Sequence, residues 1–171
     1  MADTIKDAFV SLPGTVTKEV RKNAYIYCKL RDEQFALYDE YAKRHGMLMK
    51  TLLVVNVLYY SKDGMTQTDI CRKTFQSKQT VNLIIRNLLG GEYVTLTEQE
   101  KNRRSKTVCM TESGRAFFGD AIRHITRAED KAMSMLTPSE QEQLLSLSKK
   151  FTGHLAELIK QESKEEKNGA V

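Results

Sequence analysis

Helix-breaking residues are scarce in this chain of 171 residues, and they fall at a few boundaries. From Thr15 to His45 there is neither proline nor glycine, and apolar residues recur at intervals of three and four. That spacing is typical of one face of an α-helix, and Gly46 suits the end of such a helix. Since the whole chain has only two prolines and nine glycines, it is predicted to be mainly helical.

Further helices are predicted towards both ends of the chain. Residues 47–60 are apolar on nearly all sides, which predicts a helix at the centre of the core. Thr111 can cap a helix to about Leu136, and Thr-Pro-Ser-Glu at 137–140 is a strong start for a last helix, whose tail beyond Ile159 is expected to be frayed. The first of these is expected to bury Phe117, Phe118, Ile122, Ile125, Ala128, Ala132 and Met133, and the last carries a seam of Leu144, Leu147, Phe151, Leu155 and Leu158 that faces another helix.

Two short capped helices are predicted in the middle of the chain. Thr66 can cap the first, which reaches about Lys73, and Ser77 can cap the second, which ends at Gly90-Gly91. Such a pair can place its second helix in the major groove of DNA while the first braces it. The second helix has an apolar stripe of Val81, Ile84, Ile85 and Leu88, and its other face offers Lys78, Gln79, Thr80, Asn82 and Arg86. Amides can pair with adenine and cations with guanine, although an ordinary amphipathic helix is the alternative.

A β-hairpin with a cationic tip is predicted next. β-favouring residues at 93–97 and 106–110 flank the hydrophilic loop 98–105. Residues 71–106 contain eight basic and three acidic residues, so this window accounts for the whole net charge of +5. A local basic surface indicates a polyanionic partner. Nucleic acid is the first candidate and an anionic membrane the second, because the cations are not on an amphipathic helix. A merely solvated charged face remains the alternative.

Four short motifs stand in the middle of the chain, namely Thr66-Gln67-x-Asp-Ile, Ser77-Lys-Gln-Thr-Val-Asn, Glu100-Lys-Asn-Arg-Arg-Ser-Lys and Met110-Thr-Glu-Ser-Gly. With these motifs and with the flanking helices in the expected order, nearly the whole chain resembles the MarR (multiple antibiotic resistance regulator) family of bacterial transcription factors. The resemblance implies a winged helix-turn-helix in each subunit of an obligate dimer, with the hairpin as a wing that reaches into the minor groove. The chain departs from the family pattern at Asn102, usually Asp, at Glu92, usually Gly, and at Leu83, frequently Arg.

The resemblance also implies the site residues and the partners. The partner is double-stranded DNA with a pseudo-palindromic operator, and a small aromatic or anionic effector is expected between the dimerisation helices and the DNA-binding lobe. Tyr25, Tyr38, Met47 and Met65 are candidates for the effector site, although such residues are more often core. The DNA-binding residues are expected to be Thr66, Gln67, Ser77, Lys78, Gln79, Thr80, Asn82, Arg86, Lys101, Asn102, Arg103, Arg104 and Lys106.

Other chemistry finds little support in the sequence. Three cysteines and three histidines show no metal-ligand spacing, no cofactor motif stands out, and no catalytic motif indicates an enzyme. One MarR branch senses peroxide through a cysteine directly ahead of a Phe-Ala-Leu-Tyr-like stretch, but here Gln34 precedes Phe35–Tyr38. No apolar stretch is long enough to span a membrane and no secretion signal is visible, so a cytoplasmic location is expected.

The sequence therefore predicts a mainly α protein with a small β-hairpin, in which a winged helix-turn-helix lobe joins a helical dimerisation region. The expected division is an N-terminal arm and dimerisation helix at 1–45, the lobe at 46–112, and C-terminal dimerisation helices and tail at 113–171. The arm is predicted from the helical spacing of Ile5, Ala8, Phe9 and Leu12. The predicted function is a ligand-responsive, homodimeric, sequence-specific repressor, and the alternative is a winged-helix module that binds protein.

Overall fold

The structure, a computed structural model, describes residues 16–99 and 102–168, without the side chains of 99, 102–105 and 164–168. The predicted arm with its apolar residues lies outside this range. In chain order the elements are α1 (Lys18–Arg44), α2 (Met49–Tyr59), β1 (Met65–Thr66), α3 (Gln67–Thr74), α4 (Lys78–Gly90), β2 (Val94–Gln99), β3 (Asn102–Met110), α5 (Glu112–Ser134) and α6 (Pro138–Asn168).

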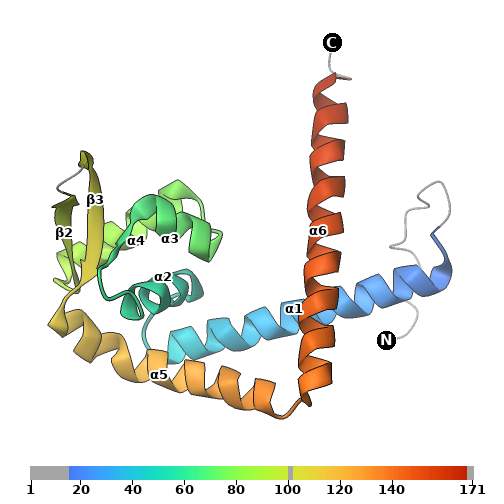
Figure 1. The fold of residues 1–171 in the computed structure, drawn as a ribbon, viewed down its shortest axis with the longest axis horizontal. Helices are drawn as coiled ribbons and strands as arrows, with labels where there is room; N and C mark the ends of the chain where they lie inside the picture. Colours follow the sequence, from blue (N-terminus) through green and yellow to red (C-terminus); the bar gives the residue numbers. More distant parts are fainter. Residues whose placement is uncertain (1–15, 100–101, 169–171) are drawn as a thin grey trace.

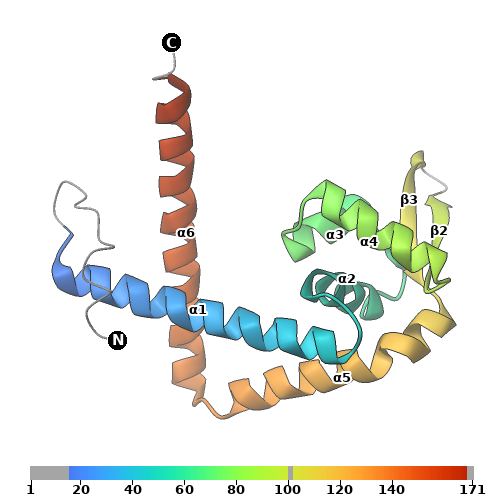
Figure 2. The same cartoon turned by 180° about the vertical axis from the view of Figure 1, so that it is seen from behind.

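A lobe made of α2, α3, α4 and the sheet lies against a frame of long helices (Figure 1). Helices α1 and α5 pass beneath the lobe (Figure 2). Helix α6 crosses α1 and lies away from the lobe. The Tyr38 hydroxyl donates to Glu129 Oε1 at 2.7 Å and the Tyr41 hydroxyl donates to the Ala121 carbonyl at 2.7 Å, which ties α1 to α5. These two hydrogen bonds thus join the second half of α1 to α5.

Serine and threonine caps determine where most of the helices begin. Their side-chain oxygens accept main-chain N–H groups that have no partner inside the helix. Thr66 accepts the Asp69 N–H at 3.1 Å, Ser77 accepts the Thr80 N–H at 3.2 Å, and α1, α5 and α6 begin in the same way at Thr17, Thr111 and Thr137. The caps predicted at residues 66, 77, 111 and 137 are therefore confirmed.

Helix α2 lies at the centre of the core, as its apolar sequence predicts. Leu52, Val54, Val55 and Leu58 are no more than 2% exposed. A helix with apolar residues on all sides has to be covered all round, and here α3, α4, α5 and the sheet cover it. The lobe thereby acquires a core that does not depend on α6.

The sheet has three antiparallel strands in the order β1-β3-β2. Val108 of β3 pairs with Met65 on one side and with Leu96 on the other, and it is fully buried. The register shifts between Glu98, which pairs with Lys106, and Gln99, which pairs with Asn102. Residues 103–105 therefore form a bulge on β3.

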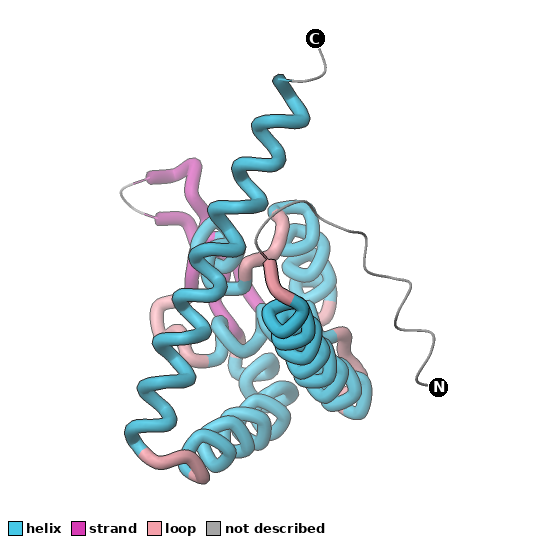
Figure 3. The backbone as a smooth tube through the Cα atoms, turned by 90° about the vertical axis from the view of Figure 1, so that its right-hand side faces the viewer, coloured by secondary structure: helices cyan, strands magenta, loops and turns pink. Residues whose placement is uncertain are grey.

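The structure corrects the sequence prediction at four places. Strand β1 was not predicted, and β2 and β3 extend into the predicted loop, because main-chain pairing does not require apolar side chains. The tail beyond Ile159 is helical to Asn168 (Figure 3), since its lysines and glutamates are good helix formers. On α5, Phe118 and Ile122 are buried and Ile125 is half-buried, but four of the residues predicted to be buried are exposed: Phe117 (59%), Ala128, Ala132 and Met133 (37%). Among the described residues, no helix is both long enough and apolar enough to cross a membrane.

Candidate nucleic-acid interface

Helix α4 separates an apolar face from a polar face. Its buried stripe of Val81, Ile84, Ile85 and Leu88 is at most 7% exposed, as predicted. The other face exposes four of the five predicted polar residues, namely Lys78, Gln79, Asn82 and Arg86, together with Leu83, which is 56% exposed. The fifth, Thr80, is half-buried, and its hydroxyl lies 2.9 Å from the Ser77 hydroxyl. The outward face is therefore polar, with one apolar position where the family pattern frequently has arginine.

Helix α3 holds α4 in place. Ile70 is fully buried, and the buried Thr74 hydroxyl donates to the Ile70 carbonyl at 2.7 Å. Arg72 pairs with Asp69, whose main-chain N–H is capped by Thr66. Thr66 and Gln67, both predicted to contact DNA, are half-buried at the start of this helix. The two helices thus form a braced pair.

The turn between α3 and α4 has a feature that sequence reasoning missed. Phe75 adopts φ of 54°, in the left-handed region, and its side chain is 95% exposed. The next residue, Gln76, donates from Nε2 to the Lys50 carbonyl at 2.9 Å and so ties the turn to α2. A tight turn of this kind favours glycine, but there is no glycine between Lys73 and Ser77. This absence was the available signal that another residue has to adopt the left-handed conformation.

The wing is described by its main chain and by its base. Lys106 on β3 is exposed. Of the other predicted wing residues, Lys101 lies outside the described residues, and Asn102, Arg103 and Arg104 are described by main chain only. Glu92 keeps the left-handed conformation, with φ of 57°, that the family's usual glycine would allow. The substitution of glycine by glutamate has therefore not removed the turn that leads into β2.

Cations without a carboxylate partner gather on the lobe. Lys73, Lys78, Arg86 and Lys106 are all exposed, and none forms an ion pair within the part of the chain that the structure describes. Arg72 is the exception, since it pairs with Asp69. The lobe therefore presents positive charge that a polyanion can neutralise.

The four effector-site candidates do not line one cavity. Tyr38 lines a hollow of about 310 Å³ between α1 and α5, and burial, followed by the hydrogen bond to Glu129, raises the pKa of Tyr38 to about 12. Met65 lines separate hollows beside β1. Met47 packs against the core, and Tyr25 is 41% exposed on α1. The structure therefore brings none of these four together.

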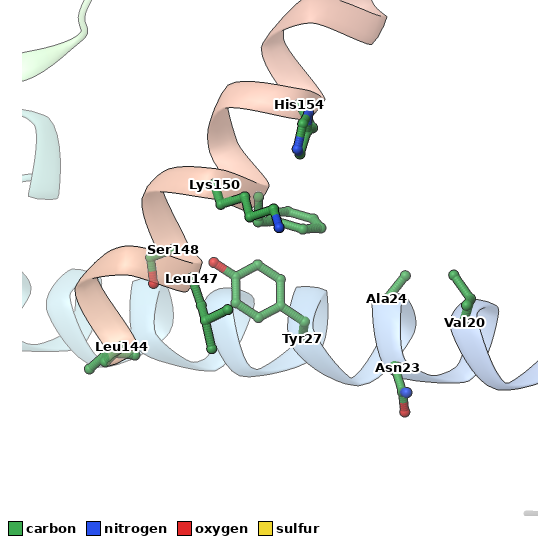
Figure 4. A pocket seen from close by; sticks show the side chains of 10 residues that line it. Val20, Asn23, Ala24, Tyr27, Leu144, Leu147, Ser148, Lys150 and His154 are labelled. Carbon is green, nitrogen blue, oxygen red and sulfur yellow. The ribbon is translucent and has the colours of Figure 1, made fainter. Parts of the chain in front are cut away.

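A larger apolar groove of about 680 Å³ lies where α6 crosses α1 (Figure 4). Val20, Ala24 and Tyr27 line it from α1, and Leu144, Leu147 and Phe151 line it from α6. The rings of Tyr27 and Phe151 meet with centroids 4.6 Å apart. The predicted seam on α6 thus contacts α1 of its own chain but stays 37–64% exposed.

The described residues contain no cluster of three or more metal-ligating side chains. Cys28, Cys71 and Cys109 are free thiols, and each is half-buried. They lie on α1, α3 and β3 respectively.

Comparison with known proteins identifies the fold. A sequence model of the MarR family matches residues 45–105, and no curated protein matches the chain. The structure of AbsC, a MarR family transcriptional regulator from Streptomyces coelicolor, is similar with a TM-score of 0.71 and 18% identity over 84% of this chain and 99% of that one. NMB1585, a MarR family regulator from Neisseria meningitidis, gives a TM-score of 0.69 and 17% identity over 85% of this chain and 99% of that one. The MepR–DNA complex of S. aureus gives a TM-score of 0.64 and 20% identity over 82% of this chain and 99% of that one.

These similarities confirm the predicted fold class, a mainly helical winged helix-turn-helix protein. The matched segment begins at the end of α1 and reaches into the wing, so it includes both helices of the braced pair. The chain thus contains a segment, residues 45–105, that matches the MarR family model, and it shares its fold with the MarR family regulators named above.

Proposed function

We propose that the chain is a transcriptional regulator that binds double-stranded DNA as a homodimer and acts as a repressor released by a small effector. The observation that carries DNA binding is the outward face of α4, where exposed amides and cations stand opposite a buried apolar stripe. A relative of the same fold has been solved bound to DNA. In this proposal α4 enters the major groove of a pseudo-palindromic operator.

The proposed contacts divide into two kinds. Gln79 and Asn82 read base edges, with Lys78 and Arg86 beside them. The wing residues Lys101, Asn102, Arg103, Arg104 and Lys106 follow the backbone and the minor groove, and Thr66, Gln67, Ser77 and Thr80 contact phosphates at the helix starts. Cations on the wing therefore supply affinity, and amides on α4 supply specificity.

A salt titration tests this division. Binding of wild type and of Arg103→Ala, Arg104→Ala, Gln79→Ala and Asn82→Ala is measured on specific and random duplexes. Each arginine variant loses one phosphate contact per subunit, so the log–log salt slope flattens by about 1.8 and affinity falls on both duplexes. The amide variants keep the slope but lose about 1–3 kcal/mol of discrimination per base contact.

The control for this titration is Lys160→Ala, which removes an exposed cation from the far half of α6. It should leave both slope and specificity unchanged. Arginine variants that lose only specificity would reverse the assignment of wing and α4. If the wild type shows neither salt dependence nor sequence preference, the alternative function, a winged-helix module that binds protein, is favoured instead.

The homodimer is supported by apolar surface that one chain leaves exposed on α1 and α6. Leu147 is 64% exposed and Leu158 is 58% exposed on the same helix. Leu147→Arg and Leu158→Arg should therefore raise the dimer dissociation constant at least tenfold, to be measured by sedimentation at fixed concentration. Ser146→Arg adds the same side chain at an exposed polar position and should leave the dimer intact. Dimers that persist in both leucine variants would refute the interface.

The effector and the cellular setting complete the proposal. We propose that the aromatic or anionic effector binds between the dimerisation helices and the lobe. In this proposal, residues 1–45 and 113–171 form the dimerisation segments and residues 46–112 form the DNA-binding lobe. The protein is proposed to act in the cytoplasm. Release from DNA is to be tested with aromatic carboxylates. Replacement of Cys28, Cys71 and Cys109 together by Ser should leave that release unchanged. If peroxide releases the wild type but not this triple variant, the sensing is thiol chemistry instead.

A further inference from the structure

Phe75 is placed where the fold gains nothing from a phenyl ring. Its side chain is 95% exposed, more than any other large apolar side chain among the described residues. Its φ of 54° lies in the left-handed region, where every residue except glycine carries strain. Neither packing nor backbone preference therefore accounts for phenylalanine at this position, and such strain is often stored at functional sites.

The turn that carries Phe75 is held on both sides. Thr74 before it is buried and its hydroxyl donates to the Ile70 carbonyl at 2.7 Å. Gln76 after it donates to the Lys50 carbonyl on α2 at 2.9 Å. The ring is therefore presented from a fixed main chain, so a partner would find it already in place.

The surroundings of the ring indicate which partner would cover it. Phe75 stands two residues before Ser77, the cap of α4, and two residues of chain span at most about 7 Å. Lys73 and Lys78 flank it, both exposed and without an ion pair in the described part of the chain. A partner at this point has to accept an apolar group between positive charges. The major groove of DNA satisfies both needs, because thymine presents a methyl group there beside the phosphates.

We infer that Phe75 contacts a thymine methyl group at the edge of the half-site that the start of α4 reads. This inference rests on the proposed DNA binding and assigns a specificity-determining contact to a residue outside α4. A thymine preference is then expected at one position of each half-site.

The test uses the full-length protein and a duplex that the wild type selects from a random library. Each thymine of the selected duplex is replaced in turn by uracil, which lacks the methyl group. Burial of one methyl group corresponds to about a fourfold change in affinity, so uracil in one half-site should weaken the wild type about fourfold, and uracil in both half-sites about sixteenfold. Phe75→Gly removes the ring and the strain from both subunits, so its affinity should fall about as much as with uracil in both half-sites, while its urea midpoint stays equal or rises.

The decisive measurement is the combination of the two changes. At the contacted position, uracil should weaken the wild type and Phe75→Leu but leave Phe75→Gly unaffected. Phe117→Ala removes an exposed phenyl ring away from this turn and should bind with the wild-type uracil profile. If Phe75→Gly binds as tightly as the wild type, or binds weakly with an unchanged uracil profile, the inference is wrong. A wild type that selects no sequence refutes the proposed DNA reading itself, which is a distinct result.

Discussion

Gly114 provides the sharpest test of how the lobe is joined to the long helices. It lies in the first turn of α5, and a Cβ added there would overlap the carbonyl oxygen of Tyr93 and stand 3.0 Å from the carbonyl carbon. The same oxygen accepts the Thr111 N–H at 3.0 Å, which joins the start of α5 to the start of β2. A methyl group at residue 114 would therefore push apart the two elements at the point where they are bonded.

The expected change in the free energy of unfolding has two destabilising contributions and one stabilising contribution. Overpacking against rigid main chain costs about 1–3 kcal/mol, and loss of the Thr111–Tyr93 hydrogen bond costs about 1 kcal/mol. Alanine is a better helix former than glycine by about 1 kcal/mol, which acts the other way. Gly114→Ala should therefore lower the free energy of unfolding by about 2 kcal/mol, or the Tm by about 4–8 °C in a chain of this size.

Urea unfolding at fixed protein concentration measures this effect, because dimerisation would otherwise shift the midpoint. Gly90→Ala is the matched control, since an added Cβ there meets nothing within 4 Å at the end of α4. The control should gain about 0.5 kcal/mol. A Gly114→Ala variant as stable as the wild type, beside a control that behaves as expected, would refute the reasoning.

Three further changes test other parts of the structure. The raised pKa of Tyr38, about 12 against an ordinary 10.0, favours the neutral hydroxyl bonded to Glu129, so its stabilisation is complete below pH 10 and lost towards pH 12. The difference in free energy of unfolding between the wild type and Tyr38→Phe should shrink over that interval, and a constant difference would contradict it. Ser77→Ala should cost about 1 kcal/mol in urea unfolding, whereas Ser77→Gly should cost only a few tenths. Arg115 donates to two main-chain carbonyls at the end of α2, at 2.8 and 3.3 Å. Arg115→Lys should therefore lower the free energy of unfolding by about 1 kcal/mol in the same assay. An unchanged urea midpoint would show that these two hydrogen bonds do not stabilise the fold.

The starts of the helices and the two faces of α4 could be predicted from the sequence because they depend on neighbours in the chain. A cap such as Ser77 acts on an N–H three residues later, and the stripe that includes Val81 and Ile85 follows the 3.6-residue turn of a helix. The motifs from Thr66 to Gly114 likewise pointed to the winged helix-turn-helix, since each is short and local. The amphipathic pattern could therefore identify the face of α4 that is proposed to read DNA.

Only the tertiary structure decided the features that depend on contacts between distant segments. Strand β1 is two residues long, too short to show alternation, and it exists because Met65 meets Val108 across the sheet. Phe117 and Phe118 have equal apolar character, yet only Phe118 faces the core, because α5 approaches the lobe along a single side. The exposure and the left-handed backbone of Phe75 follow from the packing of α3 and α4 on α2, which the local sequence does not specify. Periodicity determines which residues share a face, whereas the packing of distant elements determines what that face meets.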